Sequence, residues 1–529
     1  MTPQSSLLQL GKIVAKDMAR GGGNQGLRNI GEALASQPDS VMEVLELLLV
    51  ETRKKRPNAG LVSAFLFMLQ QALEATRWRI ENQSSEPTEL IDRMRTAIAV
   101  AAADNQFPPQ LLMLIAQCFA AAKLDIGDDL RRILASTALA PVEDAGTASP
   151  IGDFQTHLGR FAKELDHDPF LIHTKLAETF AGLLADQRIE MISVLAFSPV
   201  SSLREAAVGW LLDPDASIAN TVAGFVAQSA GRSLVSGITV NRLITMRNWV
   251  NDDRRPAIDA AIRAARQHGS ATSALSPVQI GEITATSCDG AGAQSFFVMT
   301  RKQRKLSAAC LLVKHGFGIR EAWVAHGMSR SEVEALLDHI DLEVGGWSAS
   351  LDAVQTILQH GLAVNARTSE PIPFALVQFI EATGLPAATP AYLEPGQLIG
   401  KLFEEIPANK RNDIAIWRAL AGSKHWLSEF VWVNSWFDDS AEVLAAVRRE
   451  RPAKTRTEAV LNGTIAKHRQ RWGELLAWNA LAARDDGDND EWIKFTLVAR
   501  ELLSDRPIGE IPLAVTIARS SVAAVKNRL

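Results

Sequence analysis

One stretch of the sequence, Val278 to Val324, departs from the helical pattern that surrounds it. Short apolar runs alternate there with turn signals at residues 289–292 (DGAG), 301–305 (RKQRK) and 315–318 (HGFG). Apolar runs of strand length that are separated by glycine-rich or charged turns are typical of an antiparallel meander. The chain is therefore expected to carry a small β insert between two helical arms.

The strand candidates of this insert carry apolar side chains on both faces. In QSFFVMT, residues 294–300, Phe296 and Val298 point to one side, whereas Phe297 and Met299 point to the other. Strands with two apolar faces are usually covered on both sides, and an isolated meander is only marginally stable. The sheet is therefore expected to pack between the helical arms and not to project as a free hairpin.

Two further segments extend the insert. Leu306 to Val313 is again apolar on both faces, and residues 318–325 favour a fourth strand over a short helix. Ser329 and Glu332 have the spacing of a capping box, in which each side chain hydrogen-bonds the backbone N–H of the other residue. A helix is therefore predicted from this box to Ile340.

The clearest pair of helices lies in residues 201–228, SSLREAAVGWLLDPDASIANTVAGFVAQ. Each helix has apolar residues at i, i+4, i+7 and i+8, so neither can bury its apolar face alone. These residues are Leu203, Ala207, Trp210 and Leu211 in the first helix, and Ile218, Val222, Phe225 and Val226 in the second. Trp210 and Phe225 occupy corresponding positions, so both are expected to be buried in one helix–helix contact.

This segment resembles a unit of the HEAT and armadillo families of helical repeats. The resemblance rests on the opening Leu-Arg-Glu-Ala-Ala at 203–207, the Asp-Pro-Asp turn at 213–215 and the second apolar helix. It covers one unit of roughly 30 residues. It implies a helical-repeat fold whose stacked units offer a surface to protein or nucleic-acid partners, and it implies no particular activity.

The whole chain is predicted to be mainly α: an irregular, α-solenoid-like helical-repeat protein with a small antiparallel β meander in mid-chain. Its 529 residues are too many for one compact core. Four regions are expected: an N-terminal helical region (1–140), a HEAT-like region (154–268), the meander with its following helix (277–345) and a C-terminal helical region (346–529).

Cysteine content and charge exclude several classes of protein. Three cysteines (Cys118, Cys288 and Cys310) are too few for a disulfide framework or a paired CxxC metal site, which fits a reducing compartment. A net charge of −5 argues against a globally basic nucleic-acid binder. The N-terminus lacks a signal-peptide pattern, and the apolar runs 60–73 and 107–122 are shorter than a membrane span. A cytoplasmic protein that binds no membrane is expected.

No motif in the sequence points to catalysis. Cys288 and Cys310 lie near His315 and His326 in the chain, but no family signature surrounds either thiol. Cys310 also falls inside an apolar strand, so both thiols are expected to be buried and unreactive. The ten histidines are scattered, and no HExxH helix occurs. No catalytic residue, metal ligand or cofactor is therefore predicted.

Two basic clusters are candidates for binding nucleic acid or another polyanion, because Lys and Arg neutralise phosphates. The first is the hairpin tip, with Arg301, Lys302, Arg304 and Lys305. The second lies in the C-terminal region and contains Arg448, Arg449, Arg451, Lys454, Arg456, Lys467, Arg469 and Arg471. Solvated surface is the alternative for both clusters, and charged hairpin tips also protect sheet edges from aggregation.

A cluster of tryptophans, Trp426, Trp432 and Trp436, has two interpretations. It is either core packing between helices or an aromatic groove for a protein partner, since Trp is enriched at interface hot spots. The leading hypothesis for function is a non-enzymatic intracellular scaffold that binds a protein partner through helical-repeat surfaces. The alternatives are a helical-repeat protein that binds nucleic acid or another polyanion through the basic clusters and, third, an enzyme with a site at the β insert.

Overall fold

The structure is a computed structural model, and it describes residues 3–20, 30, 34, 38–81, 86–104, 108–138, 150–274, 277–302, 305–450, 452–487 and 490–526. The protein is mainly helical with one small antiparallel sheet in mid-chain, as the sequence predicts. The chain divides into two compact units, Met1–Ala207 and Val208–Leu529. The sequence places a boundary loop at residues 141–153; residues 141–149 lie outside the described residues, and the last four belong to helix α8, which starts at Pro150.

The N-terminal unit is helical throughout its described residues. Its helices are α1 (Pro3–Ala19), α3 (Pro38–Thr52), α4 (Ala59–Glu81), α5 (Glu86–Ala103), α6 (Pro109–Ala121), α7 (Asp128–Ala138), α8 (Pro150–Glu164), α9 (Pro169–Phe180), α10 (Ala185–Ala196) and α11 (Ser201–Ala207). Helix α4 is its central element, because α1, α3, α5 and α6 all pack against it. Phe65, Met68 and Leu69 of α4 are completely buried in the resulting core.

Helix α4 has 23 residues, and among the described helices it alone is long and apolar enough to cross a membrane by length and composition. The apolar run 60–73 is only part of this helix, which starts at Ala59 and continues beyond Leu73 to Glu81. Its apolar side chains face the helices of its own unit, as those of a buried core helix do.

The C-terminal unit starts with three helices, α12 (Ala216–Gly231), α13 (Gly237–Arg247) and α14 (Arg255–Gln267), preceded by the 3₁₀ turn η1 (Val208–Leu212). The sheet follows. The remaining α-helices are α15 (Arg330–Val344), α16 (Leu351–Thr368), α17 (Ala375–Thr383), α18 (Pro395–Glu405), α19 (Asp413–Gly422), α20 (Trp426–Glu429), α21 (Ala441–Arg449), α22 (Ala453–Val460), α23 (Arg469–Ala483), α24 (Glu491–Leu503) and α25 (Pro512–Lys526). Short turns join them: η2 (Ala408–Lys410), η3 (Ser423–His425), η4 (Val431–Ser435), the π turn η5 (Leu461–Ile465) and η6 (Ile508–Glu510).

The sheet contains the predicted meander. Strands β1 (Gln279–Thr286), β2 (Ala293–Lys302), β3 (Lys305–Lys314) and β4 (Gly318–Met328) pair in chain order, each antiparallel to the next. The three predicted strands after residue 293 are therefore confirmed. A fifth strand, β5 (Gly346–Ser348), pairs with β1 and closes the order β4-β3-β2-β1-β5. The sequence did not predict β5.

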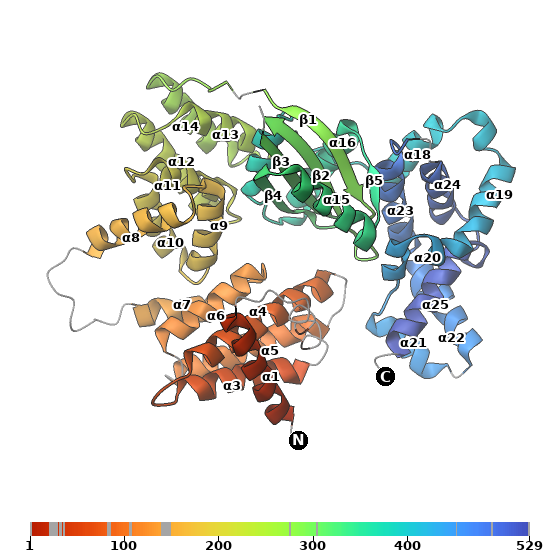
Figure 1. Ribbon diagram of the computed structural model, residues 1–529, viewed down its shortest axis with the longest axis horizontal. Coiled ribbons are helices and arrows are strands. Elements are labelled where there is room, and N and C mark those ends of the chain that lie inside the picture. The colour runs from red at the N-terminus through yellow and green to blue at the C-terminus, as the bar shows by residue number, and fades with distance from the viewer. Residues whose placement is uncertain are drawn as a thin grey trace. The chain divides into compact units, whose positions relative to one another are not determined.

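Both faces of the sheet are covered, as the two-sided strands predict. Phe297, Met299 and Cys310 lie on one face and pack against α15. Strand side chains alternate between faces, so Phe296 and Val298, both buried, lie on the other face, where α16 and α17 contact the strands. Figure 1 shows the sheet with α15 and α16 beside it. All of these covering helices follow the meander in the chain.

The predicted capping box at the start of α15 is confirmed. Ser329 is the N-cap; its hydroxyl accepts the N–H of Glu332 at 3.3 Å, and its own N–H donates to the Glu332 carboxylate at 2.8 Å. These bonds satisfy backbone groups that a helix start otherwise leaves without partners.

The helical pair at residues 201–228 differs from its prediction in one respect. The first helix ends as an α-helix at Ala207, and Trp210 lies in η1, which contacts α12. Trp210 is 3% exposed, so its predicted burial is confirmed. Phe225 is only half-buried, so its predicted burial is wrong. The five-residue 3₁₀ turn changes the angular spacing of side chains, and the two helices no longer have matching faces.

The turn between β1 and β2, residues 288–290, is bound by C-terminal helices. The Cys288 N–H donates to Oδ1 of Asn479 (2.8 Å), and the Cys288 carbonyl accepts from Asn479 Nδ2 (3.1 Å) and Trp436 Nε1 (3.2 Å). The Gly290 N–H donates to the Ser435 hydroxyl at 2.8 Å. A Cβ atom at Gly290 would lie 1.9 Å from the Ser435 carbonyl oxygen, so only glycine fits there. We call this set of contacts the turn clamp.

Trp210→Ala tests the packing of η1 against α12. Deleting a buried aromatic side chain typically costs about 3–5 kcal/mol of unfolding free energy, because the apolar packing around the ring disappears and a cavity remains. We expect a loss of that size in urea unfolding followed by circular dichroism. Trp417→Ala is the matched control: that side chain is 68% exposed, and its loss should change stability by less than about 0.5 kcal/mol. Equal effects of the two substitutions would contradict the packing described here.

Candidate functional site: a buried histidine and glutamate cluster

Three side chains from distant parts of the chain converge in the C-terminal unit. His315 follows β3, His360 lies on α16 and Glu474 lies on α23. One side-chain nitrogen or oxygen atom from each residue lies within 4.8 Å of those of the other two. His315 and His360 are buried, at 8% and 1% exposure, and Glu474 is half-buried. We call these three residues the histidine cluster.

The surrounding backbone fixes the position of each member. The His315 N–H donates to the Gly292 carbonyl at 2.8 Å, which ties the end of β3 to the start of β2. Asn365 of α16 holds Ile319 of β4 by two bonds, from the Ile319 N–H to Oδ1 (2.7 Å) and from Nδ2 to the Ile319 carbonyl (3.2 Å). Helix α23 is held by Asn479 of the turn clamp. The sheet and both helices are thus locked where the cluster forms.

Hydrogen bonds define which ring nitrogen of each histidine carries the proton. The amide of Gln294 donates to the Thr286 carbonyl at 3.1 Å, so its Oε1 is free to accept from His315 Nε2 at 3.3 Å. His360 Nδ1 accepts the Leu393 N–H at 3.2 Å, which leaves the proton of a neutral ring on Nε2. His315 therefore presents a lone pair at Nδ1, whereas His360 presents an N–H at Nε2.

Neither of these two nitrogens has a hydrogen-bond partner within the described part of the chain. Buried polar atoms without a partner are rare, because each forfeits the hydrogen bonds it makes in water. One lone pair and one N–H, on two rings of the same cluster, are complementary to a group that can both donate and accept.

Burial and aromatic contacts keep the histidines neutral. The Trp478 ring stacks on His315 at 4.9 Å between centroids and lies 4.6 Å from His360. Burial lowers the pKa of His315 well below its usual value, and burial together with the charge of Arg367 lowers the pKa of His360 to about 4. Burial also raises the pKa of Glu474. Perturbed groups gathered in one place are typical of functional sites.

The cysteines of the insert take no part in this chemistry. Cys288 and Cys310 are buried, as the sequence predicts. Burial raises the pKa of the Cys288 thiol far above its usual value and that of Cys310 to about 12. Both are therefore protonated near neutral pH, and a thiol attacks only as its thiolate.

The basic hairpin tip is exposed. Arg301 and Lys302 end β2 and Lys305 begins β3, and all three side chains are exposed; Arg304 lies outside the described residues. The opposite end of β2, at Ala293, lies nine residues from Lys302, about 30 Å along the strand. There Arg471 donates to the Gly290 carbonyl at 2.6 Å. Arg471, a member of the second basic cluster, therefore lies at the end of β2 opposite to the basic hairpin tip, and the two do not form one surface there.

The second basic cluster is largely bonded within the protein. Arg469 donates to three backbone carbonyls (Glu501, Leu502 and Arg506), and Arg456 donates to the Glu450 carbonyl. Ion pairs join Arg449 to Glu450 (3.2 Å), Lys454 to Glu458 (3.8 Å) and Lys467 to Glu442 (2.7 Å). Arg448 is exposed, and Arg451 lies outside the described residues. The bonded residues of this cluster thus hold backbone carbonyls or pair with acidic side chains. Binding of an anion by the cluster stays a prediction.

The three tryptophans proposed for a partner groove are core residues. Trp426, Trp432 and Trp436 are 1%, 5% and 0% exposed, and they pack edge-on against Phe430, Phe495 and one another. The core interpretation therefore accounts for them, and the groove interpretation is wrong. Large aromatic rings serve equally well in cores and at interfaces, so their spacing in the sequence does not distinguish the two.

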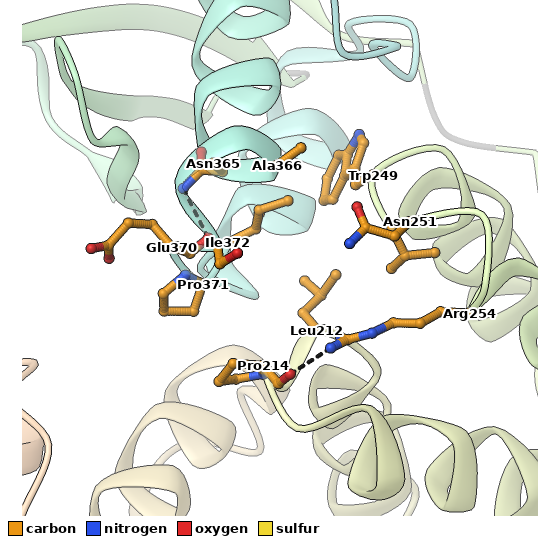
Figure 2. A pocket seen from close by; sticks show the side chains of 12 residues that line it. Leu212, Pro214, Trp249, Asn251, Arg254, Asn365, Ala366, Glu370, Pro371 and Ile372 are labelled. Carbon is orange, nitrogen blue, oxygen red and sulfur yellow. Dashed lines mark hydrogen bonds between the residues drawn. The ribbon is translucent and has the colours of Figure 1, made fainter.

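A separate pocket of about 140 Å³ lies between the η1–α12 turn, the loop before α14 and the end of α16 (Figure 2). Its two charged side chains, Arg254 and Glu370, already have partners inside the protein. Arg254 donates to the Asp213 and Pro214 carbonyls at 2.6 and 2.5 Å, and Glu370 pairs with Arg320 at 2.5 Å. The Glu370 carboxylate points away from Trp249 and Asn251 in Figure 2. This crevice therefore offers less unsatisfied polar chemistry than the histidine cluster.

Four family models match consecutive parts of the chain. They are the y4lR N-terminal domain (residues 10–126), the Y4lR second domain (185–269), a domain of unknown function, DUF7401 (276–388), and the Y4lR C-terminal helical domain (396–526). The chain is also 23% identical to the uncharacterized protein y4lR of Sinorhizobium fredii over 462 residues, which cover 85% of this chain and 87% of that protein. No solved structure matches the chain. Three of the four models are Y4lR domains and the fourth is a domain of unknown function, so the HEAT-like resemblance stays a prediction.

The neutral histidines predict how stability changes with pH. Below pH 6.5 the unfolded chain binds protons at His360, whereas the folded protein does so only below pH about 4. The contribution of the neutral His360 ring to the free energy of unfolding should therefore have its full value above pH 6.5. It should be lost as the pH falls from 6.5 to about 4, a decrease of about 3 kcal/mol from His360 alone. His315 adds to the loss in the same direction.

His360→Asn tests this expectation, because Asn keeps an acceptor for Leu393 and does not titrate. Urea unfolding across the window should show a shallower pH dependence in the variant than in the native protein. His339→Asn, on the exposed face of α15, is the matched control for the same chemical change. An unchanged slope in His360→Asn would show that His360 is not held neutral.

Proposed function

We propose that this protein is a non-enzymatic intracellular scaffold that binds a protein partner through its helical C-terminal region. The observation that carries the proposal is an apolar patch on α19. Ile414 and Trp417 are 63% and 68% exposed, and both belong to this helix. They are three residues apart, so they are neighbours on one face.

A tryptophan and an isoleucine exposed side by side form an apolar surface that a partner can cover, which supports a role in binding. Tryptophan is also among the residues that contribute most to interface affinity. Arg418 and Lys424, both exposed, accompany the patch on and just beyond the same helix. A partner helix with an apolar stripe and acidic flanks matches this surface, since opposite charges speed and orient association.

The wider fold supports a scaffold role. Helical layers surround the sheet, and the segment 201–228 resembles a helical-repeat unit, a kind of structure that commonly presents extended binding surfaces. The three cysteines are free and buried, which fits the reducing environment of the cytoplasm. We therefore propose that compartment for the protein and its partner.

The double variant Ile414→Ser/Trp417→Ala tests the patch. Both side chains are exposed, so the variant should fold with an unchanged melting temperature. We expect it to lose, in a quantitative pull-down, the partner that the native chain retains. Losing a hot-spot tryptophan costs at least about 2 kcal/mol, roughly 30-fold in affinity.

Leu342→Ser is the matched control, because Leu342 is a 77% exposed apolar residue on α15, outside the patch. It should retain the partner. Arg418→Glu/Lys424→Glu should weaken binding of an acidic-flanked partner most strongly at low salt. Full retention of every partner by the Ile414→Ser/Trp417→Ala variant would refute the proposal.

A second candidate function is binding of nucleic acid or another polyanion at the hairpin tip. Arg301, Lys302 and Lys305 are exposed there, and Leu306 pairs with Met328, which brings the 88% exposed Arg330 close to the same end of the sheet. Long basic side chains at a turn reach phosphates more readily than base edges, so this surface suits sequence-independent contact with a phosphate backbone.

Neutralising the tip, with Arg301, Lys302, Arg304 and Lys305 all changed to Gln, tests this candidate. If the tip binds duplex DNA, the slope of log affinity against log salt should flatten by about 0.9 for every phosphate that the tip no longer neutralises, or about 0.7 on single strands. Binding should weaken equally for all sequences. If the charges only protect the sheet edge, binding stays the same and aggregation increases.

A further inference from the structure

We propose that the histidine cluster binds a single oxygen atom that carries a proton, either a water molecule or the hydroxyl group of a small neutral ligand. His360 donates to this oxygen from Nε2, and the oxygen donates its own proton to Nδ1 of His315. Glu474 lies beside the pair as the third polar group. The proposal is independent of partner binding at α19.

The tautomers of the two rings carry this assignment. His315 Nε2 faces the amide oxygen of Gln294, and His360 Nδ1 faces the Leu393 N–H. The two nitrogens that face the cluster are therefore one acceptor and one donor. A hydroxyl is the simplest group that satisfies both, whereas a second N–H or a carbonyl would satisfy only one of them.

A metal ion is the obvious competitor, because two histidines and a glutamate form a ligand set that zinc uses. Zinc needs a lone pair on each ligand nitrogen, and a metal-bound histidine normally donates from its other nitrogen. His360 fails this requirement: its Nδ1 already accepts the Leu393 N–H, so a neutral ring has no lone pair at Nε2. Metal binding would require the ring to turn over or Leu393 to move away.

The distances within the cluster also have room for one oxygen. The ligand atoms of the three residues all lie within 4.8 Å of one another. Two hydrogen bonds of about 2.9 Å that meet at roughly 110° on one oxygen span such a separation, and that angle is close to the natural geometry of water.

The surroundings define the class of ligand. The Trp478 ring stacks on His315. The Tyr392 ring packs on His360, with 4.9 Å between the ring centroids, and the Arg367 guanidinium lies over the Tyr392 ring. Glu474 and Tyr392 are half-buried, so a ligand larger than water would extend toward them. A carboxylate or phosphate would meet the carboxyl of Glu474 and the lone pair of His315, which repel it. A neutral alcohol or polyol fits both groups.

Two measurements on the full chain test the proposal. The first is the nitrogen-15 spectrum of imidazole groups in protein labelled at histidine, recorded with and without zinc chloride. Variants His315→Asn and His360→Asn assign the signals. We expect both rings to be neutral with the proton on Nε2, and zinc to leave both unchanged. A His360 ring that carries its proton on Nδ1, or one whose signals move with zinc, would overturn the assignment in favour of a metal.

The second measurement is a crystal structure of the native chain, with one crystal soaked in glycerol. We expect an oxygen within hydrogen-bond distance of both His315 Nδ1 and His360 Nε2. Isolated density in both crystals identifies water, and continuous density in the soaked crystal identifies a ligand hydroxyl. An empty space between the rings would overturn the proposal, as would zinc bound to them. The variant His360→Phe, which removes the donor, should lose the oxygen while the Trp478 ring stays in place.

Discussion

Burial of the turn at residues 288–290 obliges its backbone groups to find partners inside the protein. Leaving one such group without a partner costs about 1–3 kcal/mol, so the turn can be buried only where side chains reach it. Asn479, Trp436 and Ser435 supply those partners, and Arg471 binds the Gly290 carbonyl. The turn clamp thereby joins the sheet to helices that come much later in the chain, and the C-terminal unit depends on it.

The same helix that closes the turn clamp also builds the candidate site. Arg471, Glu474 and Trp478 follow one another at intervals of three and four residues, so they lie along one face of α23. When Arg471 reaches the sheet turn, Glu474 and Trp478 are brought beside the end of β3, where His315 lies. The cluster is thus a consequence of how α23 docks, and its geometry is as rigid as that contact.

Local patterns were enough to predict the meander and the cap at Ser329, because strands and caps are encoded by neighbouring residues. Strand β5 was missed because three residues have no pattern of their own and are defined by pairing with β1. The histidine cluster was missed for a related reason: His315, His360 and Glu474 meet only in the folded chain. The tryptophans near residue 430 were ambiguous, since aromatic rings suit cores and interfaces alike.

The turn clamp has a consequence for synthesis. The bond between Cys288 and Asn479 joins residues 191 positions apart. A ribosome that adds about 5–20 residues each second makes the second partner roughly 10–40 s after the first. During that interval α15, α16 and α17 are made and can cover the strands, but the turn at residues 288–290 still lacks its partners from α23. The speed of translation between these two residues therefore sets how long the backbone groups of this turn stay without those partners.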